Sequence, residues 1–196
     1  MWLGTGEERW KTEAARLAEL FVQWSEEHGA LLAPYTSHSM PRVPFMISLT
    51  VNSLGRYLLI ENDGRIKRLI VEVMDDLIQH CIGPDGIFYY KELPSLHRPA
   101  PTPHALEALT YAFRITDDQK YLEIASRQFA AMVASPAGQG GGPKRIDKSG
   151  AVVSGSGGGR DFADRYQSIL VFASEAAPRG LLDWYRYPFA RGPRKR

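Results

Sequence analysis

The chain is poor in cysteine, with Cys81 as the only one among 196 residues. A single thiol cannot close an internal disulfide, so nothing in the sequence requires an oxidising compartment. Long hydrophobic runs are also missing: no apolar stretch reaches about 18 residues, and no membrane-spanning helix is expected. The first residues lack the basic and then apolar pattern of a secretory signal peptide, which makes a cytoplasmic location the default expectation.

An excess of charge of one sign is absent as well, because 24 Lys and Arg stand against 22 Asp and Glu. Four of the basic residues lie within the last six positions, so the rest of the chain is slightly acidic. A nucleic-acid partner is therefore not expected. The basic tail could bind phosphate, although short terminal runs of this kind are more often solvated ends. With 44% hydrophobic residues, the composition is that of a folded domain and not of a disordered chain.

What is present throughout the chain is helical periodicity, and no segment shows convincing strand alternation. We expect an all-α fold of six helices. The first helix covers residues 10–28 and ends at His28-Gly29, the second covers 44–60, and the third is capped by Asn62 and reaches Cys81. The fourth begins at Thr102-Pro103, the fifth begins with a Thr116/Gln119 capping box, and the sixth covers about 161–177.

The connections between these helices alternate between two kinds. Short turns at 61–63 and 116–117 are typical of antiparallel helical hairpins. Connections 29–43, 83–101 and 136–160 are long, and long loops in a compact domain are usually functional or disordered. The helix starts at Pro44-Phe45, Pro103-His104 and Phe162-Ala163 recur at equal spacing, which indicates a repeated hairpin. We therefore expect the helices that begin at these points to lie side by side and parallel.

The second hairpin carries a family resemblance. It runs from Pro103-His104-Ala105-Leu106 through Thr116-Asp117-Asp118-Gln119-Lys120-Tyr121-Leu122. This resembles the T-G-D-x-K-Y-L phrase of the six-hairpin glycosidase superfamily and of related polysaccharide lyases and epimerases, with Asp117 where Gly is common. The resemblance implies antiparallel helical hairpins that form a partial (α/α) toroid, about half a ring, over residues 1–178. An aromatic and basic C-terminal tail would follow at 179–196.

The resemblance also implies a carbohydrate-active, glycoside hydrolase-like protein whose substrate lies at the rim where the inner helices begin. Sugar rings stack on aromatic side chains and bond to carboxylates. The residues expected to bind an oligo- or polysaccharide are His38, Asp85, Tyr89, Tyr90, Glu92, His104 and Asp161, and Asp164 is the candidate catalytic acid.

Each of these residues also has an ordinary structural interpretation. Asp85 lies in Pro-Asp-Gly, which is common turn chemistry, and Asp161 is a first-turn acid favoured by the helix dipole. Some of the aromatic residues 88–90 must point into the core. Glu107 could face either the lumen or a neighbouring hairpin.

Motifs for metals and cofactors are absent, and neither is expected. There is no HExxH or paired-histidine spacing, and the glycine-rich run at 155–160 lacks the Gly-Lys-Ser/Thr of a phosphate loop. The alternative function is a non-catalytic helical-repeat module that binds a protein or glycan partner. Because the first helix, with Trp10, Phe21 and Trp24, lacks an inner partner, we also expect a homo-oligomer or part of a longer protein.

Overall fold

The computed structural model describes residues 2–29, 31, 41–93, 98–134, 145–146, 152–153 and 158–182. The helices are α1 (Trp2–Thr5), α2 (Glu8–His28), α3 (Pro44–Tyr57), α4 (Gly64–Cys81), α5 (Pro103–Thr116), α6 (Lys120–Ala134) and α7 (Gly158–Ala176). The all-α prediction is confirmed. The additions in the described residues are the short helix α1 and an antiparallel pair of two-residue strands, β1 (Arg145–Ile146) and β2 (Val152–Val153), within the third long connection.

Most helix ends follow the predicted signals, and the exceptions concern which side chain caps the helix. Gly29 ends α2 in the left-handed region, with φ at 75°. The cap of α4 is Asp63 and not Asn62: the Asp63 carboxylate accepts the backbone N–H of Arg65 at 2.8 Å. Thr102 does precede α5, but its side chain makes no capping bond.

The capping box predicted for Thr116 and Gln119 is wrong. Thr116 is still the last residue of α5, so its hydroxyl donates back to the carbonyl of Ala112 at 2.9 Å. Asp117 then turns the chain with φ at 58°, and the carboxylate of Asp118 accepts the backbone N–H of Lys120 at 3.0 Å. The Thr116 hydroxyl also accepts the backbone N–H of Asp118 at 3.2 Å, so the threonine and both aspartates shape the hairpin turn without forming a capping box with Gln119.

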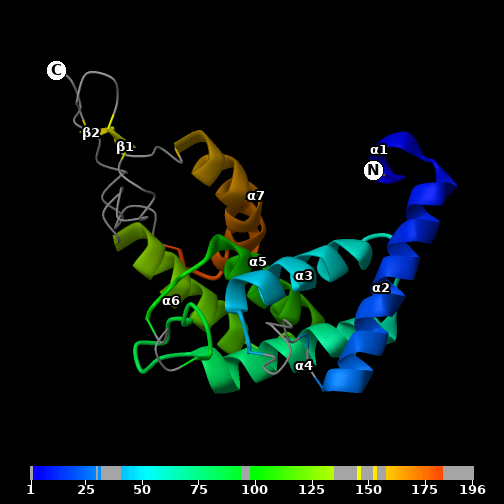
Figure 1. Cartoon of the computed structure of the whole chain (residues 1–196), viewed down its shortest axis with the longest axis horizontal. Helices are drawn as coiled ribbons and strands as arrows, with labels where there is room; N and C mark the ends of the chain where they lie inside the picture. The colour runs from blue at the N-terminus through cyan, green and yellow to red at the C-terminus, as the bar shows by residue number, and fades with distance from the viewer. Residues whose placement is uncertain are drawn as a thin grey trace.

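Helix α5 lies at the centre of the molecule and packs against α3, α4, α6 and α7 (Figure 1). Side-chain contacts connect α3 to α5 and α5 to α7. In each pair of helices, the residue numbers of the two contacting residues increase together along the contact. These contacts are Asn52 with His104, Arg56 with Glu107, Glu107 with Ser168, and Arg114 with Glu175. The three helices α3, α5 and α7, called the parallel helices below, therefore run side by side in the same direction, as the repeat predicts.

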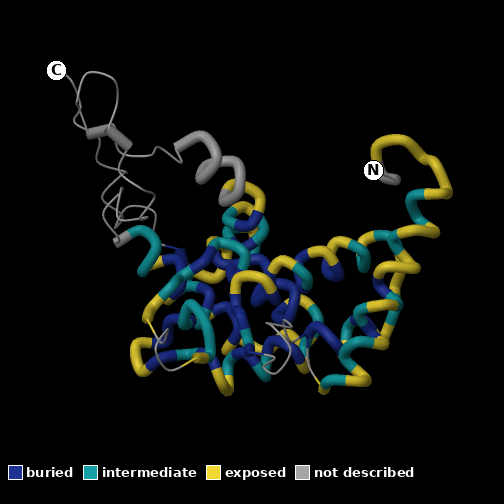
Figure 2. Tube along the Cα trace, viewed as in Figure 1, coloured by how far each residue is buried: buried dark blue, intermediate teal, exposed yellow. Residues whose placement is uncertain are grey.

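The core is formed mainly by α4, α5 and α6 (Figure 2). Every residue from 105 to 113 on α5 is buried. The apolar stripe of α4, which repeats at helical spacing, is buried in full: Ile66, Leu69, Ile70, Val73, Leu77 and Cys81. None of the described helices is both long and apolar enough to cross a membrane.

Helix α2 is covered only in part. Only Ala18 and Val22 are buried, while Leu17 is 44% and Leu20 is 47% exposed. The buried Ala18 and Val22 lie to one side of the apolar stripe that contains Trp10, Phe21 and Trp24. Part of that stripe therefore faces outward.

Helices α3 and α5 approach each other closely at Gly55, in the last turns of α3. A Cβ atom at this position would lie 2.4 Å from the ring of Tyr111. Only glycine leaves room for the aromatic ring there, which accounts for a residue that is otherwise unfavourable inside a helix.

Candidate functional site

The loop that follows α4, here called the rim loop (residues 82–93 and 98–101), contains four of the predicted ligand residues. Ile82 pairs with Phe88, and Tyr89 pairs with Pro99, as isolated antiparallel bridges. The Asp85 carboxylate accepts the backbone N–H of Ile87 at 3.0 Å, so this exposed side chain shapes the turn.

A glutamine from α6 holds the rim loop in place. Gln128 is fully buried; its amide donates to the carbonyl of Gly86 at 2.8 Å and accepts the N–H of Phe88 at 3.3 Å. No role for Gln128 was predicted from the sequence. The signal available in the sequence is that Gln128 lies on α6 between the apolar Ala125 and Phe129, which are buried. A glutamine buried there needs hydrogen-bond partners for its amide.

The three consecutive aromatic residues of the rim loop divide between core and surface. Phe88 is fully buried, and Tyr89 and Tyr90 are half-buried. The Tyr90 ring centroid lies 5.0 Å from the guanidinium carbon of Arg98 and 5.5 Å from Nζ of Lys91. Tyr90 is therefore an aromatic surface flanked by two cations.

Arg42 fastens the rim loop to the start of α3. Its guanidinium donates to Glu92 at 2.8 Å and to Asp76 on α4 at 2.7 Å. The backbone N–H groups also cross, from Arg42 to the Glu92 carboxylate and from Glu92 to the Arg42 carbonyl, each at 3.0 Å. The hydrogen bond to Asp76 raises the pKa of Arg42. Glu92, predicted to bind sugar, thus joins two of the long connections.

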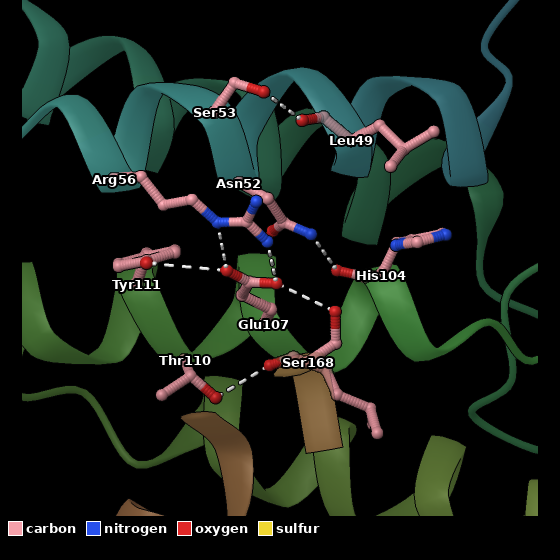
Figure 3. Close-up of polar contacts among 10 residues, drawn as sticks. Leu49, Asn52, Ser53, Arg56, His104, Glu107, Thr110, Tyr111 and Ser168 are labelled. Atoms are coloured by element: carbon pink, nitrogen blue, oxygen red, sulfur yellow. Dashed lines mark hydrogen bonds and ion pairs between the residues drawn. The ribbon is translucent and has the colours of Figure 1, made fainter. Parts of the chain in front are cut away.

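A polar cluster connects the three parallel helices and consists of Arg56, Glu107, Tyr111 and Ser168 (Figure 3). The fully buried carboxylate of Glu107 accepts two hydrogen bonds from Arg56, at 3.0 and 2.9 Å, and one from Ser168 at 2.8 Å. Tyr111 Oη lies at 3.5 Å. Glu107 therefore contacts the parallel helices on both sides of α5.

The hydrogen bonds and burial of the polar cluster indicate that Glu107 holds the parallel helices in position and does not transfer a proton to or from a substrate. The hydrogen bond with Glu107 raises the pKa of Arg56, and burial raises the pKa of Tyr111. Both carboxylate oxygens of Glu107 are engaged and none of its surface is exposed, so a substrate cannot reach it. Arg56 is different, since 44% of its side chain is exposed beside the cluster.

Two buried oxygens lie near the cluster on α3. Asn52 Nδ2 donates to the carbonyl of His104 at 3.1 Å, but Asn52 Oδ1 and Ser48 Oγ have no hydrogen-bond partner within the described residues. Ordered water is the usual partner of such groups. His104 lies in the first turn of α5 and is half-buried.

Apolar side chains are exposed along α3 on the side away from its buried residues. Phe45 is 36%, Met46 40% and Leu49 41% exposed. Phe45 and Met46 follow Arg42 closely, which places them at the end of α3 that meets the rim loop. We call these three residues the apolar face of α3.

The predicted site residues are thus brought together in part. The rim loop contains Asp85, Tyr89, Tyr90 and Glu92. Its two halves are joined shortly before α5 by a hydrogen bond from the N–H of Ala100 to the carbonyl of Phe88, at 2.8 Å. His38 lies outside the described residues. Asp161 and Asp164 lie in α7, where their side chains are outside the described part. Among the residues that are described, no group of His, Cys, Asp and Glu could hold a metal ion.

Cys81, interpreted from the sequence as a core residue, is fully buried at the end of α4. Burial raises the pKa of its thiol to about 12. Because the thiolate is the reactive form, we expect Ellman's reagent at pH 8 to label no thiol in the folded protein and one per chain in guanidinium chloride. Rapid labelling of the folded chain would contradict this burial.

Comparisons with known proteins give no relative: no family model, curated protein or solved structure matches the chain.

Proposed function

We propose that the chain is a partial (α/α) toroid that binds an oligo- or polysaccharide at the rim where α3 and α5 begin. The observation that carries this proposal is the apolar face of α3, which begins three residues after Arg42, the residue that pairs with Glu92 of the rim loop. Sugar rings present apolar C–H faces that stack on such side chains, while nearby polar groups bond to hydroxyls. Arg98 and Lys91, which flank the Tyr90 ring, supply donors beside that aromatic surface.

The toroid interpretation is supported by the repeated order of helices. The parallel helices α3 and α5 each turn back through a short connection into α4 and α6, and each long connection then leads to the next parallel helix. In an arrangement of this kind, the parallel helices form the inner layer and α2, α4 and α6 the outer one.

Binding without turnover agrees with the described side chains better than hydrolysis does. Glycoside hydrolysis usually needs two carboxylates that flank the scissile bond. Asp85 shapes a turn, Glu92 is paired with Arg42, and Glu107 is sealed in the polar cluster. Asp164 remains the candidate acid of the hydrolase hypothesis.

We expect Phe45→Ala and Tyr90→Ala each to weaken glycan binding about 10-fold, the loss of one stacking contact. A glycan array identifies the ligand, and calorimetry measures its affinity for each variant. Leu59→Ala is the matched control, because Leu59 is 65% exposed just after the opposite end of α3. The thermal transition should stay unchanged in all three variants.

Failure of the array with every glycan, or equal affinities for Phe45→Ala and Leu59→Ala, would refute the proposed site. A reducing-sugar assay on the bound glycan separates the two functions. Release of reducing ends that disappears in Asp164→Asn would establish the hydrolase hypothesis in place of the binding one.

A further inference from the structure

A small cavity lies between α2 and the first half of α4. Its volume is about 140 Å³. Val22 of α2 and Leu69 of α4 are its most buried lining residues, at 7% and 5% exposed, and both belong to the apolar core. A cavity of about 150 Å³ can hold a molecule of the size of benzene. This one therefore has room for a small ligand with an apolar group, and it is separate from the rim loop, which follows the other end of α4.

Most of the charged side chains that line this cavity have no partner. Arg65 is the exception, because it donates to the carboxylate of Glu19 at 2.9 Å and so joins α4 to α2. The other charged residues of the lining are Glu26, Arg68 and Glu72, and all three are exposed. Within the described part of the chain none of these three forms an ion pair, although Arg68 and Glu72 lie one helical turn apart. The cavity thus presents one cation and two carboxylates beside an apolar lining.

We propose that this cavity binds a small zwitterion with an apolar group, such as a free amino acid. The guanidinium of Arg68 pairs with the carboxylate of the ligand, which it can hold through two parallel hydrogen bonds. The carboxylates of Glu26 and Glu72 accept hydrogen bonds from the ligand ammonium, and its apolar group packs against Val22 and Leu69. Each part of the ligand thus matches one kind of side chain in the lining.

Charge distinguishes a zwitterion from a plain anion or cation of the same size. A plain anion would be attracted by Arg68 but repelled by the carboxylates of Glu26 and Glu72, and a plain cation would be repelled by Arg68. A zwitterion places each of its charges opposite a side chain of the other sign. Because exposed ion pairs are weak in water and are screened by salt, we expect a dissociation constant in the millimolar range that rises with salt concentration.

The test is a titration of the full chain followed by heteronuclear NMR. The probes are L-valine and two molecules that keep its isopropyl group but only one of its charges, isobutylamine and isovalerate. L-Valine should shift the amide signals of residues around the cavity, and the shifts should saturate. Each single-charge probe should bind at least about 5-fold more weakly, since it loses one of the two ion pairs.

Variants of the lining locate the site. Arg68→Gln and Glu72→Gln should each raise the dissociation constant for L-valine about 5-fold, whereas Lys67→Gln, which removes a neighbouring cation outside the lining, should leave it unchanged. An absence of saturable shifts with L-valine, equal affinities for the three probes, or equal affinities of Arg68→Gln and Lys67→Gln for L-valine would each overturn the proposal. Circular dichroism melts check that the variants fold, and Glu26→Gln takes the place of Glu72→Gln if that variant does not.

Discussion

Replacing Arg56 with methionine is expected to lower the free energy of unfolding by about 3 kcal/mol, within the range for breaking a buried ion pair. The carboxylate of Glu107 would lose its only cationic partner among the described residues while remaining fully buried. The hydroxyls of Ser168 and Tyr111 would remain, but neither carries a charge. Because Arg56 is 44% exposed, water entering its place offsets part of the loss. Urea denaturation measures the change.

The double variant Arg56→Met/Glu107→Gln provides the control for this result. Glutamine keeps the shape of Glu107 without its charge, so at least half of the lost stability should return. Arg16→Met removes an exposed guanidinium that pairs with Glu13, and it should change stability by less than about 0.5 kcal/mol. A double variant as unstable as the single one would show that the unpaired charge is not the cause.

Gly55→Ala is expected to lower the free energy of unfolding by about 2 kcal/mol. The new methyl group would lie 2.4 Å from the Tyr111 ring, so α3 and α5 must separate or the ring must move. Overpacking of this kind costs roughly 1–3 kcal/mol, and the intrinsic preference of alanine for a helix returns about 0.5–1 kcal/mol. Thermal or urea unfolding measures the balance.

Gly64→Ala is the matched control, because Gly64 begins α4 and nothing lies within 4 Å of the added carbon. This variant should be neutral or slightly more stable than the wild type. In Gly55→Ala/Tyr111→Leu the smaller side chain makes room for the methyl group. The loss should therefore be less than the sum of the two single losses, and additive losses would contradict the close approach.

The helices could be predicted from sequence because their signals are local. The α4 stripe repeats at helical spacing over the whole helix, and all of it is buried. The cap of α4 could not be assigned, because Asn62 and Asp63 are adjacent and both are good capping residues. Partial exposure of α2 agrees with the expectation that the first helix lacks an inner partner, but which of its apolar side chains are exposed could not be read from the stripe.

The candidate site was predictable only where it lies within one segment. The rim loop showed its turn and its aromatic residues in the sequence. Glu107 was noted as able to face a neighbouring hairpin, but its partners Arg56 and Ser168 come from two other helices. Contacts between such distant positions leave no local pattern, so one sequence alone does not reveal them.

The attachment of the rim loop to Gln128 has a consequence for engineering. Both hydrogen bonds of this glutamine go to backbone atoms, the carbonyl of Gly86 and the N–H of Phe88. The attachment does not depend on which side chains the loop displays at the surface. Substitutions at half-buried loop positions such as Tyr90 should therefore leave the loop attached, which makes these positions the ones to vary if the proposed glycan binding is to be engineered.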